Sequence, residues 1–123
     1  MATKKQGLDV TRKTLRLAKT ENKYKNALKN GETKDLLTIE PLIEFEHFRI
    51  IPNKYPHDKI AKTHHLLIPK RRIDSWTKFN RKERKEFKKL DGFLRHKYDS
   101  ISQNYPSLLS VRDIVHWHLY ILK

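Results

Sequence analysis

Short apolar segments along the chain predict a sheet of about five β-strands. They are rich in β-branched and aromatic side chains, and prolines or short polar turns separate them. The predicted strands cover residues 42–45, 48–52, 64–69, 108–111 and 114–122. The third of these is a compact apolar run that Pro69 ends, and its nearly continuous apolar character predicts a central strand.

A longer segment has the spacing of an amphipathic helix. Asn80 is followed three residues later by Glu83, which is the signature of a capping box. The apolar residues that recur after it at steps of three and four are Phe87, Leu90, Leu94, Tyr98 and Ile101. This pattern predicts a helix over residues 80–102, with Tyr105-Pro106 ending it.

The first 36 residues predict a basic helix. They carry ten basic and four acidic residues, and the apolar positions with helical spacing are Leu17, Tyr24 and Leu28. Asp9 or Thr11 can cap the start and Asn30-Gly31 can end it, which predicts a helix over about 11–29. The apolar stripe is thin, so a peripheral helix laid on the domain and a nucleic-acid-binding arm both stay open.

The predicted elements add up to an α+β fold, in which helices cover one face of an antiparallel sheet of about five strands. A chain of 123 residues buries one modest core. We therefore expect one α+β domain over residues 37–123 with two main helices, preceded by a basic N-terminal arm over residues 1–36.

The last predicted strand places unusual chemistry on one face. In an extended strand the period of two puts His116, His118 and Tyr120 on the same side. The residues between them, Trp117, Leu119 and Ile121, then point toward the core. Imidazole can attack phosphorus, shuttle protons or bind a metal, so the pattern alone leaves three functions open.

Composition narrows the class of partner. Lys and Arg number 28 against 14 Asp and Glu, a formal net charge of +14 that attracts nucleotides and nucleic acids. The chain has no cysteine, which excludes disulfides and thiolate chemistry. No apolar run has the length of a membrane span, and residues 1–7 are polar, so we expect a cytoplasmic protein without a membrane partner.

Two separate segments together resemble the histidine triad (HIT) superfamily of nucleotide-binding proteins. One is Asn53-Lys54-Tyr55-Pro56 followed by Thr63-His64-His65-Leu66-Leu67-Ile68-Pro69-Lys70-Arg71, and the other is His116-Trp117-His118-Leu119-Tyr120-Ile121-Leu122. The match covers about residues 42–122, and the basic helix lies outside it. The resemblance implies a HIT-like sheet in which the two histidine strands are neighbours.

The resemblance also implies roles for individual residues. His118 corresponds to the nucleophile that attacks the α-phosphorus, and His116 would orient it and the phosphate. His64 would complete the hydrogen-bonded network, and Asn53 lies where a ribose partner is often found, although turn chemistry also explains an asparagine there. The implied function is a nucleotide hydrolase or nucleotidyltransferase for a purine nucleotide, without a cofactor; homodimers are common in the family.

Three departures from the family pattern bear on the activity. Tyr120 replaces the third histidine, and its phenol cannot supply a cation near neutral pH. The segment before His116 has no glycine; Arg112 there is a candidate phosphate clamp, although Asp113 beside it favours an ordinary turn. Arg71-Arg72 stands where a histidine often follows the strand and would favour phosphate binding at the rim.

Alternatives remain beside the nucleotide site. A zinc site would use His64, His116 and His118, and a binding module on the same scaffold would use the basic helices to contact RNA or DNA with little catalysis. A purely structural role for these three histidines is a further alternative. We interpret His47, His57 and His96 as ordinary turn or surface residues, and we expect His65 to face away from His64.

Overall fold

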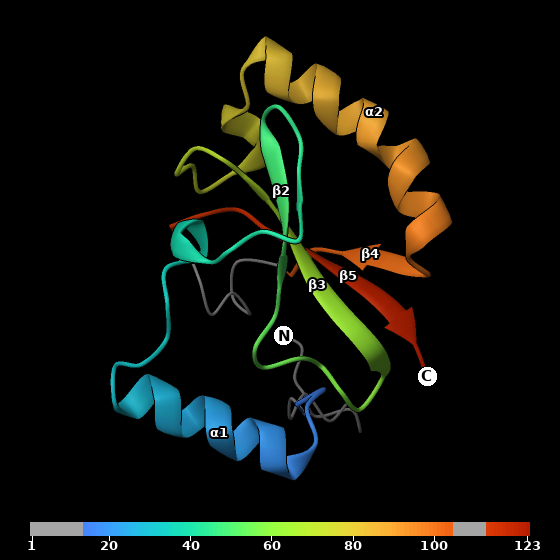
Figure 1. Cartoon of the computed structure of the whole chain (residues 1–123). Helices are drawn as coiled ribbons and strands as arrows, with labels where there is room; N and C mark the ends of the chain where they lie inside the picture. The colour runs from blue at the N-terminus through green and yellow to red at the C-terminus, as the bar shows by residue number, and fades with distance from the viewer. Residues whose placement is uncertain (1–13, 105–112) are drawn as a thin grey trace, which may run out of the picture.

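The structure is a computed structural model and describes residues 14–104 and 113–123. Its helices are α1 (Ala18–Lys29) and α2 (Arg81–Lys97), with short 3₁₀ turns η1 (Leu36–Thr38) and η2 (Trp76–Lys78). The strands are β1 (Ile43–Glu44), β2 (Phe48–Pro52), β3 (Ala61–Pro69), β4 (Ser100–Ser102) and β5 (Trp117–Leu122). Figure 1 shows α2 at the top of the view and α1 at the bottom, with the strands between them.

The strands form one antiparallel sheet in the order β1-β2-β3-β5-β4. This confirms the predicted α+β class and the central place of the third strand, which has β2 on one side and β5 on the other. β3 begins at Ala61, three residues before the predicted start, because its first residues pair with the end of β5. β5 begins at Trp117, so Ile114, Val115 and His116 are buried but precede the strand.

The capping box at the start of α2 is confirmed. The Asn80 side chain accepts a hydrogen bond from the Glu83 amide at 2.8 Å, and the Glu83 carboxylate accepts one from the Asn80 amide at 2.8 Å. The predicted helix was too long, because α2 ends at Lys97 and residues 100–102 form β4. Pairing with β5 supplies hydrogen bonds that outweigh the helical spacing of Ile101.

The start of α1 also differs from the prediction. Residues 14–17 are not helical, and the helix begins at Ala18 rather than near residue 11. The residue before it, Leu17, has no capping side chain, and the Asp58 carboxylate from the β2–β3 loop accepts the Leu17 amide at 2.7 Å. The proposed caps Asp9 and Thr11 lie outside the described residues. The predicted end is confirmed, since Gly31 adopts a positive φ of 67°.

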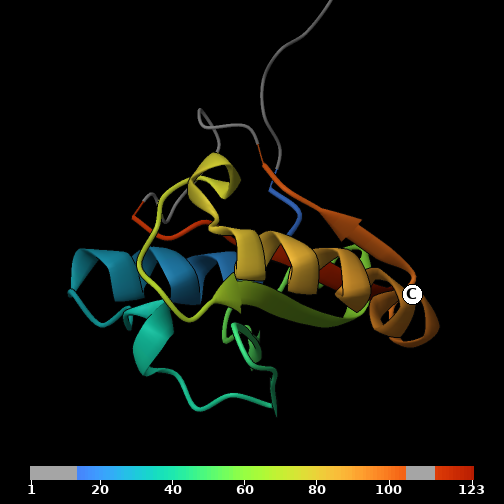
Figure 2. The same cartoon turned by 90° about the horizontal axis from the view of Figure 1, so that it is seen from above.

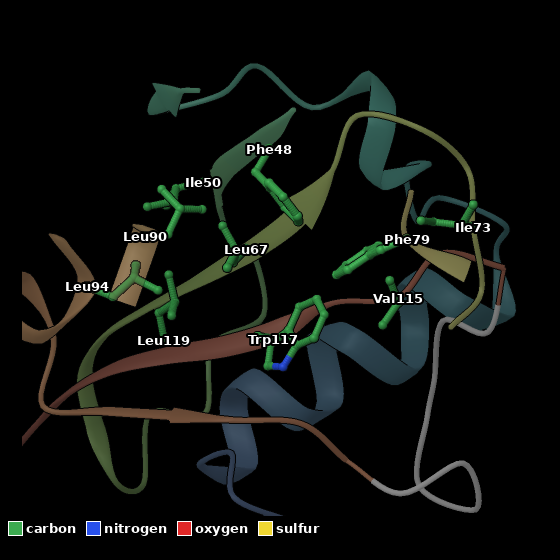
Figure 3. Packing of buried hydrophobic residues seen from close by; sticks show 10 residues of the cluster. All are labelled: Phe48, Ile50, Leu67, Ile73, Phe79, Leu90, Leu94, Val115, Trp117 and Leu119. Carbon is green, nitrogen blue, oxygen red and sulfur yellow. The ribbon is translucent and has the colours of Figure 1, made fainter. Parts of the chain in front are cut away.

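The main core lies between α2 and one face of the sheet. Figure 3 shows its side chains from several elements meeting across this layer, which contains Phe48, Ile50, Leu67, Ile73, Phe79, Leu90, Leu94, Val115, Trp117 and Leu119. Trp117 and Leu119 point into this core, as the period of two predicts. Figure 2 shows α2 running across the sheet.

A second, smaller cluster packs on the opposite face, where Leu36 of η1 meets the sheet residues Ile51, Leu66 and Ile68 and the neighbouring Ile114. The alternate residues of β5, His118 and Tyr120, therefore belong to the face that carries η1. The predicted strand at 108–111 lies outside the described residues. Neither helix in the described ranges is long and apolar enough to cross a bilayer.

Candidate active site

The pairing of β3 with β5 brings the two histidine segments together. In the antiparallel register His64 lies opposite Tyr120, and Leu66 lies opposite His118. The rings of His64 and His118 have their centroids 5.0 Å apart, and those of His116 and His118 are 5.3 Å apart. The sheet therefore gathers the three histidines that the sequence singles out, although His64 and His116 lie 52 positions apart in the chain.

A chain of hydrogen bonds orders the protons on these rings. The His57 amide donates to Nδ1 of His64 at 2.8 Å, and Nε2 of His64 lies 2.8 Å from Nδ1 of His118. Because Nδ1 of His64 accepts, the proton of its neutral ring is on Nε2 and is donated to His118. His118 then carries its own proton on Nε2.

The Nε2 atom of His118 is buried and has no hydrogen-bond partner within the described structure. His116 has the opposite arrangement, since its Nδ1 lies 3.1 Å from the Ile114 carbonyl and must donate to it. Nε2 of a neutral His116 therefore has a free lone pair. The two neighbouring rings thus present one donor and one acceptor, and a buried donor without a partner is a place for an anionic ligand atom.

His57 belongs to this cluster, which the interpretation as an ordinary turn residue missed. Its Nδ1 lies 2.8 Å from the Tyr120 hydroxyl, and its ring stacks on His118 with centroids 5.1 Å apart. The β2–β3 loop turns back at this point, because the amides of Ile60 and Ala61 both bond to the His57 carbonyl. The sequence signal was a histidine in the loop directly before β3, but only the folded loop places it over β5.

The other two histidines given ordinary roles are outside the site, in agreement with the prediction. The His47 amide donates a hydrogen bond to Glu86 of α2 at 2.7 Å, and His96 is exposed on α2. His65 points to the other side of β3, where Nδ1 lies 2.7 Å from the Tyr98 hydroxyl. This confirms that His64 and His65 face opposite ways.

Burial keeps the clustered imidazoles neutral. Desolvation is the largest cause in each case and lowers the pKa of His118 to about 3 and that of His57 to about 4. The same effect lowers the pKa of His64 and of His116. Burial raises the pKa of Tyr120, so its phenol keeps its proton. These rings can donate and accept hydrogen bonds at neutral pH, but they supply no positive charge.

A cavity of about 480 Å³ opens beside the cluster. His116, His118 and Leu66 line it from the sheet side, and Tyr24 and Leu28 of α1 form part of the opposite wall. Its surface is mostly apolar, and Leu36, Ile39 and Pro52 also contribute to it. A volume of this size suits a small organic ligand with an apolar ring.

Asn53 lines the same cavity and takes part in two local contacts. Its side-chain oxygen accepts the Tyr55 amide at 2.9 Å, and its nitrogen lies 3.3 Å from Nδ1 of His64. Asn53 therefore stabilises the turn, which is one of the two roles that the sequence left open for it. The side chain also connects the turn to the histidine cluster.

The arginines predicted at the rim have carboxylate partners. Arg71 forms two hydrogen bonds with the buried Glu83, at 2.8 and 2.9 Å, and Arg72 pairs with Asp113 at 2.6 Å and with Asp35. The expectation that both favour phosphate binding is corrected, because their charges are already compensated. Arg112 lies outside the described residues.

The geometry changes which histidines could bind a metal ion. The nitrogen atoms that lie within 4.8 Å of one another belong to His57, His64 and His118, so His57 takes the place expected for His116. A metal at Nε2 of His64 would need the lone pair of that atom, yet Nε2 carries the proton because Nδ1 accepts the His57 amide. The hydrogen bonds therefore oppose a metal at this cluster.

No family model matches the sequence, and no curated protein matches it. Several solved structures resemble the fold. A HIT family hydrolase from Legionella pneumophila is 19% identical with a TM-score of 0.52, over 76% of this chain and 87% of that one. A histidine triad protein from Clostridium difficile is 17% identical with a TM-score of 0.51, over 79% of this chain and 86% of that one.

A hypothetical histidine triad nucleotide-binding protein from Sulfolobus tokodaii is 21% identical with a TM-score of 0.51, over 77% of this chain and 65% of that one. The chain therefore has the histidine triad fold. The resemblance that two short sequence segments suggest is confirmed at the level of the fold.

Proposed function

We propose that this protein binds a purine nucleotide in the cavity and transfers its nucleoside monophosphate through His118. The observation that carries the proposal is the buried Nε2 of His118, which lies without a partner in the wall of a cavity that also has an apolar side. A phosphate oxygen there would accept its proton, and the base would contact the apolar wall around Leu28 and Leu36.

The reaction would proceed in two displacements at the α-phosphorus. The Nε2 lone pair of His118 forms a bond to phosphorus, and the bond to the leaving group breaks with its electron pair on that group, which takes up a proton. Water or another acceptor then forms the new phosphorus–oxygen bond, loses its proton, and returns the electron pair to His118. His116 and His64 would orient the ring, and Asn53 would bind the ribose.

The proton order sets a condition on the first step. His118 must lose its Nε2 proton before that atom can attack, and in the neutral ring the proton must then lie on Nδ1, facing His64. His64 would need a proton on Nδ1, where the His57 amide now donates. The attacking form therefore requires the β2–β3 loop to release this hydrogen bond.

This condition favours a second candidate, a nucleotide-binding module with weak or absent catalysis. In the arrangement described here His118 is a hydrogen-bond donor, which suits binding of phosphate better than attack on it. Tyr120 adds to this, because a phenol in place of the third histidine gives no cation for the developing charge. The basic surface would then serve binding, including binding of RNA or DNA.

A trapping experiment distinguishes the two candidates. The protein is incubated with adenosine 5′-phosphoramidate or a dinucleoside polyphosphate, quenched, and examined by mass spectrometry for one added adenylate. Catalysis predicts an adduct in the wild type and in His96→Asn, whose residue is exposed on α2, but none in His118→Asn. Binding of AMP without an adduct or turnover supports the module. If the wild type binds neither AMP nor the nucleotide substrate offered, both candidates fail.

Nucleic-acid binding has a separate test. Affinity for single-stranded RNA or DNA should fall steeply with salt and persist in His118→Asn, because the contacts would be to phosphates along basic helices. A flat salt response removes this part of the proposal.

We also propose that residues 37–123 form the domain and residues 1–36 an arm. Homodimerisation and a cytoplasmic location stay predictions, and sedimentation and cell fractionation test them.

A further inference from the structure

Arg16 lies in the wall of the cavity and is held by three neighbours. Its Nε donates to the Tyr55 carbonyl at 2.8 Å, and its guanidinium carbon lies 4.1 Å from the centre of the Tyr24 ring. Its Nη1 lies 3.4 Å from the Glu21 carboxylate. These contacts fix the planar group in one orientation, and only 15% of the side chain is exposed.

The contacts of Arg16 leave it able to receive an anion. Within the described residues Nη2 has no hydrogen-bond partner, although the side chain lines the cavity. Glu21 also faces Lys25 at 3.9 Å, so one carboxylate is shared by two cations and this small group keeps a net positive charge. Among the described residues that line the cavity, Lys34 and Lys54 add two further cations, and Glu32 is the one acid.

The histidine cluster lacks such a charge. Burial keeps His57, His64 and His118 neutral, and burial raises the pKa of Tyr120, which lies opposite His64, so its phenol is neutral as well. The charge of Arg16 contributes to lowering the pKa of these three histidines, after burial, which agrees with its place near the cluster. In the cavity wall the imidazoles therefore provide hydrogen bonds, and Arg16, in the segment before α1, provides positive charge.

We propose that Arg16 binds a phosphate group beyond the α-phosphate, so that the cavity selects nucleoside polyphosphates over nucleoside monophosphates. This rests on the proposed function and names its substrate class. With the α-phosphate at His118, Nη2 of Arg16 would donate to an oxygen of the next phosphate. The departing group in the proposed reaction would then be a phosphate chain, whose negative charge a fixed guanidinium stabilises.

Calorimetric titration with AMP, ADP and ATP tests the proposal on the full chain without divalent metal. The measured quantity is the ratio of ATP affinity to AMP affinity. We expect Arg16→Gln to lower this ratio about tenfold or more, since a charge-assisted hydrogen bond is lost. Arg16→Lys keeps the charge without the planar group and should restore part of the ratio.

Lys19→Gln is the matched control, because it removes one positive charge from an exposed position of α1, three residues after Arg16, outside the cavity wall. It should leave the ratio within about twofold of the wild type. A ratio is used because partial unfolding of a variant reduces the apparent binding of both ligands alike.

Other results of the titration distinguish failure of the role of Arg16 from failure of the proposed function. If Arg16→Gln weakens AMP and ATP equally, Arg16 has a structural role and the inference fails, while the proposed function stands. If the wild type binds ATP no better than AMP, the selection is absent and the inference fails again. If the wild type binds none of the three nucleotides, the proposed function itself is overturned.

Discussion

The neutral histidine cluster makes a quantitative prediction about stability below neutral pH. In the folded chain burial lowers the pKa of His118 from 6.5 to about 3, and the side chain is 6% exposed. In the unfolded chain the ring titrates near its ordinary value. Below pH 6.5 the unfolded state therefore binds a proton that the folded state does not, so stability is complete above that pH and falls as the pH is lowered.

The size of the effect follows from this difference. Each pH unit within the window between the two pKa values changes the free energy of unfolding by about 1.4 kcal/mol per proton. Between pH 8 and pH 5, His118 alone should cost about 2 kcal/mol. His57 and His64 act with the same sign, because burial lowers their pKa values as well.

Urea unfolding followed by circular dichroism at pH 8, 7, 6 and 5 measures this dependence. The free energy of unfolding of the wild type should fall between pH 8 and pH 5, and this fall should be about 2 kcal/mol smaller in His118→Asn. The comparison holds whatever the stability of the variant at pH 8. His96→Asn is the control, because it removes an exposed imidazole from α2. A wild-type stability that is flat over this range, or a His118→Asn curve parallel to it, would refute the buried neutral cluster.

Three further predictions concern single contacts, each measured as the free energy of unfolding. Leu119→Ala should cost about 2–5 kcal/mol, because this fully buried side chain fills the main core; a cost below about 1 kcal/mol would contradict the packing. Gly31→Ala should cost about 1 kcal/mol, because its φ of 67° strains an L-residue although no atom lies near the added carbon. Tyr120→Phe should cost about 1–3 kcal/mol by leaving Nδ1 of His57 without its hydroxyl partner, and an unchanged stability would show that this contact contributes nothing.

Local patterns in the sequence determined much of the fold. The alternation of Trp117 and Leu119 with His118 and Tyr120 correctly separated a core face from a histidine face, because the period of a strand is a property of the backbone. Ile121, which the same pattern predicted for the core, is only partly buried and lies outside the main core cluster. The capping box at Asn80 and Glu83 placed the start of α2, since both partners lie within one helical turn. The end of α1 at Gly31 followed from the same kind of local rule.

Contacts between distant segments decided the rest. Residues 100–102 left the helical pattern because β5 offered them hydrogen bonds. The Leu17 amide at the start of α1 is bound by Asp58, and the position of this carboxylate depends on how the β2–β3 loop folds. No local rule contains such information, because it depends on which segments meet in space.

The site divides in the same way. The sequence predicted His116 and His118 as site residues, since imidazoles at alternate positions of a strand share a face, and the resemblance to the family added His64. The tertiary structure alone brought His57 over His118, set the order of protons along the hydrogen-bonded rings, and placed Arg16 in the cavity wall. Residue type fixes what a side chain can do, but burial and the partners supplied by other segments fix its charge and its proton, and these depend on the completed fold.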